Sequence, residues 1–92
     1  MGTVSLRRIL RWEIPVDDQW HELELGPDGI AHVAARSADA VEVWAVHDPR
    51  LVKVRRRFTV VGTGHPVPDL TRHVGTALAP HGLVWHLLED IR

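Results

Sequence analysis

Hydrophobic and polar residues alternate along most of this chain, in short runs separated by glycine, proline and acidic residues. The clearest case is 20–25, where His21, Leu23 and Leu25 fall on one side and a tryptophan and two glutamates on the other. A period of two is typical of a strand with one buried face. The same criterion, with β-branched and aromatic content, predicts short strands at 6–14, 20–25, 41–46, 58–61, 74–78 and 83–88. A seventh strand, at 30–36, is expected only because the turn before it needs a returning partner.

Two turns of similar composition support this pattern. The segments at 26–29 and 79–82 both carry proline at the second position and glycine at the fourth, which suits a type I turn closed by a left-handed residue. We therefore expect two hairpins, the first joining 20–25 to 30–36 and the second joining 74–78 to 83–88. Seven short strands at close spacing predict an all-β fold, a small antiparallel sandwich or barrel.

One alternative fold stays open. Apolar residues and a histidine between Leu70 and Leu78 also share one helical face behind Asp69, a suitable N-cap. Gly75 and Thr76 weaken such a helix, and the turn that follows suits a hairpin, so a strand is preferred. An α+β fold with a helix near 70–79 is the alternative, and the alanine-rich stretch 31–40 also has helical propensity.

The length and composition limit the kind of protein. A chain of 92 residues builds one core, so we expect a single domain at 1–92. It has no cysteine, which excludes disulfides, thiolate zinc sites and cysteine nucleophiles and allows a reducing compartment. No apolar run is long enough for a membrane span, and arginines interrupt the first fifteen residues where a signal peptide would need an apolar region. We expect a cytoplasmic protein with no membrane partner.

The four tryptophans divide into two pairs by their surroundings. Trp44 and Trp85 lie in apolar runs and are expected to anchor the core. Trp12 and Trp20 lie among charged residues and are candidate interface residues, with a rim position at the end of the fold as the alternative. The remaining predicted core positions are the apolar residues of the seven strands: Leu6, Ile9, Ile14, Leu23, Leu25, Ile30, Val33, Val41, Val43, Phe58, Val60, Val74, Leu78, Val84 and Leu87.

The segment 62–69 is the best candidate for a site. It reads Gly-Thr-Gly-His-Pro-Val-Pro-Asp and follows a predicted strand. Glycines at a strand end can point successive backbone amides at an anion, and the histidine adds a donor, a base or a metal ligand. The candidate ligand-binding residues, for a nucleotide or phosphate, are Gly62, Thr63, Gly64, His65, Arg55 and Arg57. No Lys-Ser or Lys-Thr follows as in a P-loop, so a rigid, purely structural crossing is the preferred interpretation.

A basic run at 50–57 suggests a second kind of partner. It gathers five of the eleven basic residues, and such clusters attract nucleic-acid phosphates. The chain as a whole has a net charge of −1, and no nucleic-acid-binding motif accompanies the run. An edge strand that carries positive charge to prevent aggregation explains the same residues. The charge is uneven, −4 over residues 1–46 and +3 over 47–92, which suits contact between copies.

Neither metal binding nor catalysis has a strong signal. The seven histidines lack an established zinc-ligand spacing, so no metal site and no cofactor are expected. Of the hydroxyl residues, Thr63 beside His65 is the nearest to a nucleophile and base, but alternation in sequence does not establish that geometry. We expect a protein that is not an enzyme and has no catalytic residues.

Several segments together resemble a known family. Residues 57–68, 73–76 and 84–89, with shorter runs at 12–15 and 44–48, are similar to a family of uncharacterised small proteins of actinobacterial phages and prophages. The Gly-Thr-Gly-His-Pro segment at 62–66 is the most specific part. The resemblance implies a phage origin and an accessory role in the host cytoplasm, and it supplies no active site.

Two functional hypotheses follow. The first is a phage accessory protein that binds a host or phage protein without catalysis and forms a homo-oligomer. The second is a small-ligand binding protein that uses the loop at 62–65. Nucleic-acid binding through the run at 50–57 is a further alternative.

Overall fold

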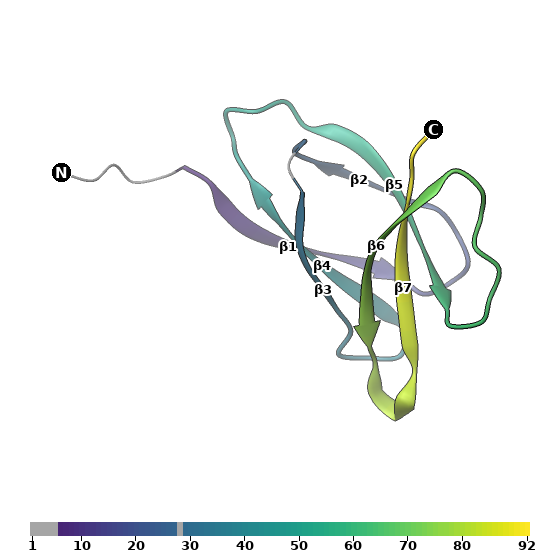
Figure 1. Cartoon of the computed structure of the whole chain (residues 1–92). Coiled ribbons are helices and arrows are strands. Elements are labelled where there is room, and N and C mark those ends of the chain that lie inside the picture. Colours follow the sequence, from purple (N-terminus) through teal and green to yellow (C-terminus); the bar gives the residue numbers. More distant parts are fainter. Residues whose placement is uncertain (1–5, 28) are drawn as a thin grey trace.

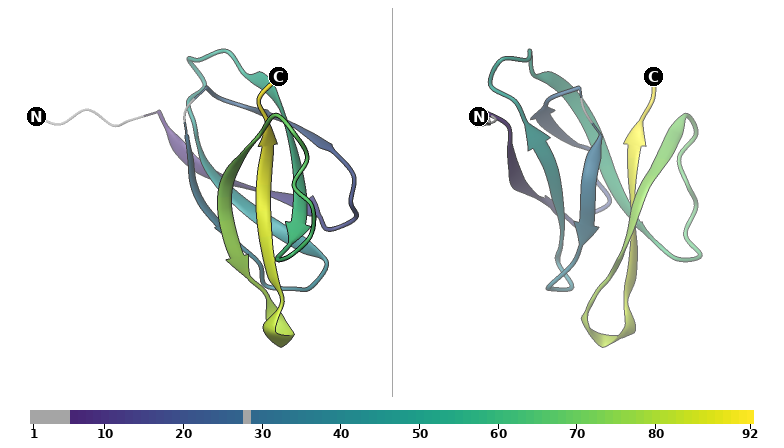
Figure 2. Two further views of the ribbon diagram at one scale, coloured as in Figure 1. Left: turned by 45° about the vertical axis from the view of Figure 1, so that its right-hand side comes forward. Right: turned by 60° about the vertical axis from the view of Figure 1, so that its left-hand side comes forward.

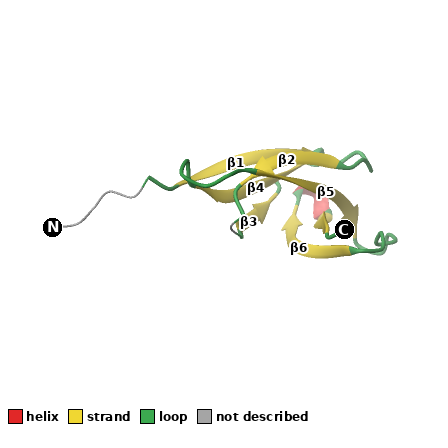
Figure 3. Cartoon of the chain, turned by 90° about the horizontal axis from the view of Figure 1, so that it is seen from above, coloured by secondary structure: helices red, strands yellow, loops and turns green. Residues whose placement is uncertain are grey.

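The computed structural model describes residues 6–27 and 29–92, and within them seven strands follow one another along the chain (Figure 1). The strands are β1 (Arg8–Pro15), β2 (His21–Leu25), β3 (Ile30–Ala34), β4 (Ala40–His47), β5 (Val54–Gly62), β6 (Thr71–Leu78) and β7 (Val84–Asp90). The all-β prediction is confirmed, and each predicted strand is present. The strand β6 occupies the place of the alternative helix near 70–79, so the α+β alternative is wrong. The one helical turn of the described residues is Pro80–Gly82, red in Figure 3.

The strands form two antiparallel sheets that pack face to face (Figure 2). One sheet has the order β1-β4-β3 and the other the order β2-β5-β7-β6. The sheets come closest where β3 meets β6. A side chain on Gly75 of β6 would place its Cβ 2.8 Å from Cγ2 of Val33, so only glycine fits there without a shift. The fold is therefore a sandwich. Along one side of it, the backbone of β6 at Gly75 packs against the side chain of Val33 on β3.

The first predicted hairpin is wrong. β2 pairs with β5 and β3 pairs with β4, so the segment at 26–29 crosses from one sheet to the other. Residue 28 of that segment lies outside the described residues. This pairing sets opposite charges against each other, since Glu22 and Glu24 of β2 lie opposite Arg57 and Arg55 of β5. The composition of this turn indicated that the chain reverses there. It did not indicate that the next strand would belong to the other sheet.

The second hairpin is confirmed with a different turn. β6 and β7 pair directly, and both His81 (φ 64°) and Gly82 (φ 74°) have left-handed backbone angles. The Leu83 N–H donates to the Pro80 carbonyl at 3.5 Å. Two left-handed central residues define a type I′ turn, whose twist matches that of paired strands. The reversal is thus centred one residue later than the predicted type I turn.

The core lies between the sheets and is built from alternate residues of the strands. Its buried members are Ile14, Leu25, Val33, Val41, Val43, Phe58, Val60, Ala77 and Leu87. Three of the predicted core residues are exposed instead: Leu6, Ile9 and Leu78 are 55%, 62% and 76% exposed. Leu6 precedes β1. Leu78 follows the buried Ala77, and Ile9 lies next to the row of β1 that faces inward, so alternation turns both side chains outward. Within the described residues no helix is long and apolar enough to cross a membrane.

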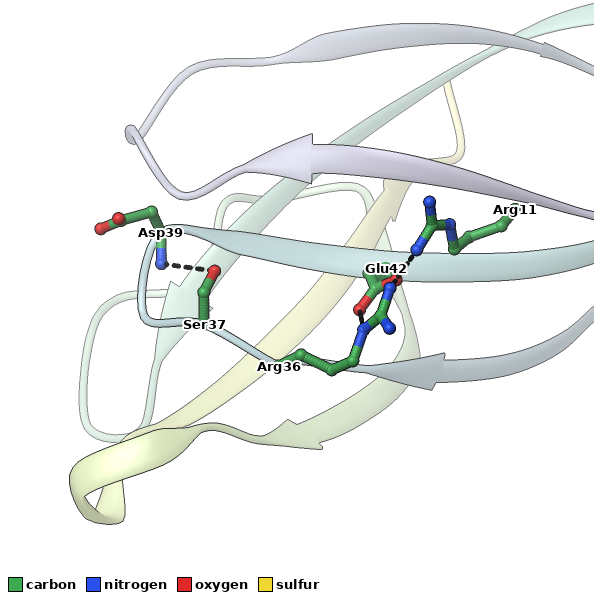
Figure 4. Close-up of polar contacts among 5 residues, drawn as sticks. All are labelled: Arg11, Arg36, Ser37, Asp39 and Glu42. Carbon is green, nitrogen blue, oxygen red and sulfur yellow. Dashed lines mark hydrogen bonds and ion pairs between the residues drawn. The ribbon is translucent and has the colours of Figure 1, made fainter.

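The outer face of the three-stranded sheet carries a buried carboxylate rather than an apolar core (Figure 4). Glu42 of β4 is only 4% exposed, and it accepts hydrogen bonds from Arg11 (2.7 Å) and from Arg36 (2.6 and 2.7 Å). Trp44, two residues further along β4, lies on this same face with its ring centroid 5.5 Å from that of His32. The prediction that Trp44 anchors the core is therefore wrong, because Val43 and Ala45 occupy the inward positions.

Candidate functional site

The segment after β5 crosses a face of the four-stranded sheet. β5 and β6 both pair antiparallel with β7, which lies between them, so β5 and β6 run parallel. Residues 63–70, the crossover loop, must therefore return along the length of β7 before β6 begins (Figure 1). Beneath the loop Leu88 of β7 is 3% exposed although its side chain points away from the core. The interpretation of 62–69 as a crossing segment is confirmed by this topology.

A tight turn starts the crossover loop. The His65 N–H donates to the Gly62 carbonyl at 3.1 Å, and Gly64 has φ +89°, as in a type II turn. At Gly62 a Cβ would lie 3.2 Å from Nδ1 of His65 and 3.2 Å from Cζ3 of Trp85. Gly64 thus provides the left-handed backbone of the turn, and Gly62 leaves space for the rings of His65 and Trp85. The His65 amide is also used within the turn, so it is not available to an anion.

A hollow of about 450 Å³ lies between the crossover loop and the outer face of the sheet. Its apolar side is formed by valine and leucine side chains of β5, β7 and the loop, and its polar side by histidines and threonines. The lining residues are Val61, Gly62, Thr63, Gly64, His65, Val67, Thr71, His73, His86 and Leu88. Among these described lining residues there is no Asp, Glu, Lys or Arg. The site therefore offers an apolar surface beside imidazole and hydroxyl groups.

A chain of hydrogen bonds holds the polar side in place. His86 Nε2 lies 2.8 Å from Oγ1 of Thr63, and His86 Nδ1 lies 3.0 Å from Oγ1 of Thr76. The Thr76 hydroxyl also lies 3.0 Å from Nε2 of His73, whose ring centroid is 5.5 Å from that of His86. Both nitrogens of His86 are therefore engaged by hydroxyls, which fixes the plane of its ring. His86 is partly buried, and it lies on the outer face of the sheet.

Two imidazoles keep hydrogen-bonding capacity. Within the described part of the chain, the His65 ring has no hydrogen-bond partner, and His73 uses only Nε2. Each can donate or accept according to its tautomer. Thr63 is paired with His86 and not with His65, the partner considered from the sequence. In a catalytic triad a carboxylate orients the histidine ring. Here the Thr76 hydroxyl, and not a carboxylate, contacts Nδ1 of His86 and orients its ring. The arrangement is suited to binding a polar edge of a ligand.

The structure brings together four of the six predicted ligand-binding residues. Residues 62–65 all line the hollow, whereas Arg55 and Arg57 belong to the opposite end of β5. Arg55 lies 3.9 Å from Glu24, and Arg57 contacts Asp90 at 3.0 Å. Neither arginine reaches the loop, because the strand holds them near its start.

Most of the basic run is paired with carboxylates of the same chain. In addition to the two pairs above, Arg50 contacts Asp48 at 2.9 Å, and Arg56 contacts Glu89 at 2.6 Å. β5 lies between β2 and β7 in the sheet, but residues 54–57 pair only with β2 and the pairing with β7 begins at Phe58, so the basic part of β5 has one unpaired edge, as the edge-strand interpretation expects. Four of the five basic side chains face a carboxylate within their own chain, and this lowers their value as a phosphate-binding surface.

The two candidate interface tryptophans are both partly buried. Trp12 on β1 packs against the core. Trp20 precedes β2, and the Arg57 guanidinium carbon lies 5.0 Å from the centroid of its ring, in cation–π geometry. Both have a role within the fold as well as some exposed surface.

Sequence reasoning missed the residues that β6 and β7 bring to the site. Thr71, His73 and Thr76 share a face of β6, and His86 and Leu88 share the matching face of β7. Alternation places His86 and Leu88 on one face, whereas Thr76 joins Thr71 and His73 only because β6 has a register shift between His73 and Gly75. The strand order then sets that face under the loop. For the residues that the structure describes, no group of three or more His, Cys, Asp or Glu side chains could hold a metal ion.

A known protein family covers almost the whole chain. The family described as "Domain of unknown function (DUF7352)" matches residues 5–92. The chain belongs to this family. The match includes all seven strands and the crossover loop, so the hollow lies within the DUF7352 domain. No curated protein and no solved structure matches the chain.

Proposed function

We propose that this DUF7352 protein binds a small molecule, without catalysis, in the hollow beneath the crossover loop. The observation that carries the proposal is the juxtaposition of an apolar surface with two histidines that have hydrogen-bonding capacity to spare. A volume of about 450 Å³ is within the usual size of small-ligand sites. The pre-ordered His86 ring means that little side-chain entropy is lost when a ligand arrives.

The lining residues select the chemistry of the ligand. Val61, Val67 and Leu88 favour a flat apolar body, and His65 and His73 favour an edge that carries both donors and acceptors. Because the described lining has no arginine or lysine, a phosphate group gains nothing there. We therefore propose an uncharged heterocycle in place of the nucleotide or phosphate that the glycines alone suggested.

The test is a fragment titration monitored by backbone amide NMR. A nucleobase, its nucleoside and its nucleotide are compared with inorganic phosphate. We expect the base and nucleoside to shift the amides of Gly64, His73 and His86 and the phosphate to shift none of them. Added phosphate groups should leave affinity unchanged or weaken it. A panel that leaves these amides unmoved, or binding that requires the phosphate, contradicts the proposal.

Two matched pairs of variants locate the binding. Val67→Trp fills the hollow from an exposed loop position, and Val52→Trp adds the same side chain at an exposed position of the β4–β5 loop, outside the lining. His73→Ala removes one imidazole of the site, and His32→Ala removes one from the other sheet. We expect each first variant to weaken binding at least tenfold and each second variant to keep it. Equal effects within a pair would place the ligand elsewhere.

A second candidate function is supported by the other end of the molecule. The start of β1 pairs with the end of β4, and the loop that follows β4 exposes Leu51 (42%) and Val52 (82%) beside it. Leu6, before β1, is 55% exposed. An exposed apolar group of this kind suits contact with another protein. With the resemblance to phage and prophage proteins, it supports an accessory protein in the host cytoplasm that binds a host or phage protein.

The protein-binding candidate is tested by quantitative recovery from host lysate. The wild type and the Val67→Trp variant should both retain a specific partner. The double variant with Leu51→Asp and Val52→Asp should lose it. Retention of the same proteins by the doubly substituted chain would contradict this candidate and leave the ligand site unaffected.

A further inference from the structure

The four sheet edges of the sandwich differ in how they are protected. Edges with unpaired backbone groups recruit other strands unless they are short, bulged, charged or covered. β3 and β6 come together where Val33 meets Gly75, and each has a register shift. β2 has only five residues, and two of them are exposed glutamates. These three edges therefore carry the usual protection.

β1 differs from them, because its exposed charged residues, Arg8, Arg11 and Glu13, are of both signs. It has eight residues, and its pairing with β4 continues without a shift from Arg8 to Pro15. In the described part of the molecule no strand pairs with its other edge, as the right-hand view of Figure 2 shows. Ile9 is 62% and Leu10 is 39% exposed. A long, regular and partly apolar edge of this kind is able to add a further strand.

The sequence of β1 is complementary to itself when reversed. A two-fold axis through Trp12 and perpendicular to the sheet places Arg11 of one copy opposite Glu13 of the other, twice. Moving the axis by one residue in either direction would oppose Arg11 to Arg11 or Glu13 to Glu13. Opposite charges on directly facing residues stabilise a strand pair, and like charges destabilise it.

Both charged residues are accessible for such a contact. The Arg11 side chain remains 44% exposed while it contacts Glu42, so its remaining donors can reach a second carboxylate. Glu13 is exposed and is in no ion pair among the described residues. We propose that the protein forms a two-fold symmetric dimer in which the β1 strands of two copies pair antiparallel around Trp12. The two three-stranded sheets then become one continuous six-stranded sheet, and both hollows stay open on the other sheets.

Sedimentation equilibrium tests the dimer. The wild type should have twice the 10.4 kDa mass of one chain. Glu13→Arg faces Arg11 of the partner and should raise the dissociation constant at least tenfold. Glu22→Arg, the same change on β2, should leave it unchanged. A wild type that is monomeric up to about 0.5 mM, or a Glu13→Arg variant that dimerises as tightly as the wild type, overturns the proposal.

The register is tested by cross-linking, since the chain has no cysteine of its own. Arg11→Cys and Glu13→Cys chains are prepared separately and oxidised alone and as a mixture. The register around Trp12 predicts disulfide-linked dimers only in the mixture, with one Arg11–Glu13 pair retained. Cross-linking of either variant alone at the level of the mixture overturns this register. Circular dichroism of each variant verifies that the sandwich is intact, and the ligand titration is unaffected by the outcome.

Discussion

At the scale of single residues, one buried carboxylate at the open margin between the sheets ties three strands together. Glu89 of β7 accepts hydrogen bonds from Arg56 of β5 at 2.6 and 2.8 Å, and it also contacts Arg72 of β6. Arg56 is 11% exposed, and its guanidinium also lies over the ring of Phe58. Burial by itself would raise the pKa of Glu89, but the hydrogen bonds from Arg56 and Arg72 outweigh it, so the pKa lies below its ordinary value.

Removal of this charge should cost much of the stability of the fold. Glu89→Gln leaves Arg56 buried without its counter-charge, and we expect the free energy of unfolding to fall by about 3 kcal/mol. Glu24→Gln is the matched control, because Glu24 is 65% exposed and 3.9 Å from Arg55. Its loss should be below about 0.5 kcal/mol. Urea denaturation followed by tryptophan fluorescence measures both, and equal losses would contradict the structural role of Glu89.

Single residues also show where sequence patterns are sufficient. Alternation correctly predicted buried Ile14, Phe58 and Leu87, because each lies on the inward row of its strand. Trp44 was expected in the core because it lies in an apolar run, but its place between the inward-facing Val43 and Ala45 puts it on the outer face. Alternation could not find the contacts of Glu89, because Arg56 is 33 residues away in sequence and neither residue lies in a recognisable motif.

At the scale of elements, the approach of β6 to β3 depends on a missing side chain. Gly75→Ala would place a Cβ 2.8 Å from Cγ2 and 3.0 Å from Cβ of Val33, and valine has little freedom to rotate away. We expect a loss of about 1–3 kcal/mol from overpacking. Gly29→Ala, where no atom lies within 4 Å of the new Cβ, should be tolerated.

A double-mutant cycle separates overpacking from loss of backbone freedom. Val33→Ala removes the Cγ atoms that the new methyl group meets, so the doubly substituted protein should recover part of the loss from Gly75→Ala. Thermal unfolding of the four proteins gives the coupling energy. Strict additivity would show that the two strands do not meet as described.

The elements were predictable in number and type, but their partners were not. Local patterns predicted six of the seven strands, and the turn at 79–82 predicted the β6–β7 hairpin. The strand at 30–36 was expected from the turn before it, and it is present although it pairs with β4 and not with β2. The pairing of β2 with β5 joins segments that are far apart in the sequence, so the local turn signal at 26–29 led to the wrong partner. For the same reason residues 62–65 were found as a candidate site, and His73 and His86 were missed until the order β5-β7-β6 placed them beneath the loop.

At the scale of the whole molecule, carboxylates paired with arginines are distributed over both sheets, and this determines the response to acid. The pKa values of Glu42, Glu89 and Asp90 all lie below their ordinary values. That of Asp48 falls from an ordinary 3.8 to about 2, because the Arg50 side chain and backbone N–H donate to it. Carboxyls of this kind hold their protons more weakly in the folded state than in the unfolded state. The stability they contribute is therefore complete above the unfolded pKa and is lost as the pH falls through the folded one.

The Asp48 pair gives this pH dependence a defined window. We expect the wild type to lose stability between about pH 4 and pH 2, and Arg50→Met to flatten the profile there, because Asp48 then loses the main cause of its lowered pKa. Arg55→Met removes an arginine whose partner is mostly exposed, and its profile should keep the wild-type slope. Urea midpoints measured at half-unit steps of pH compare the three proteins. Parallel profiles for Arg50→Met and the wild type would show that the Asp48–Arg50 pair does not contribute to acid sensitivity.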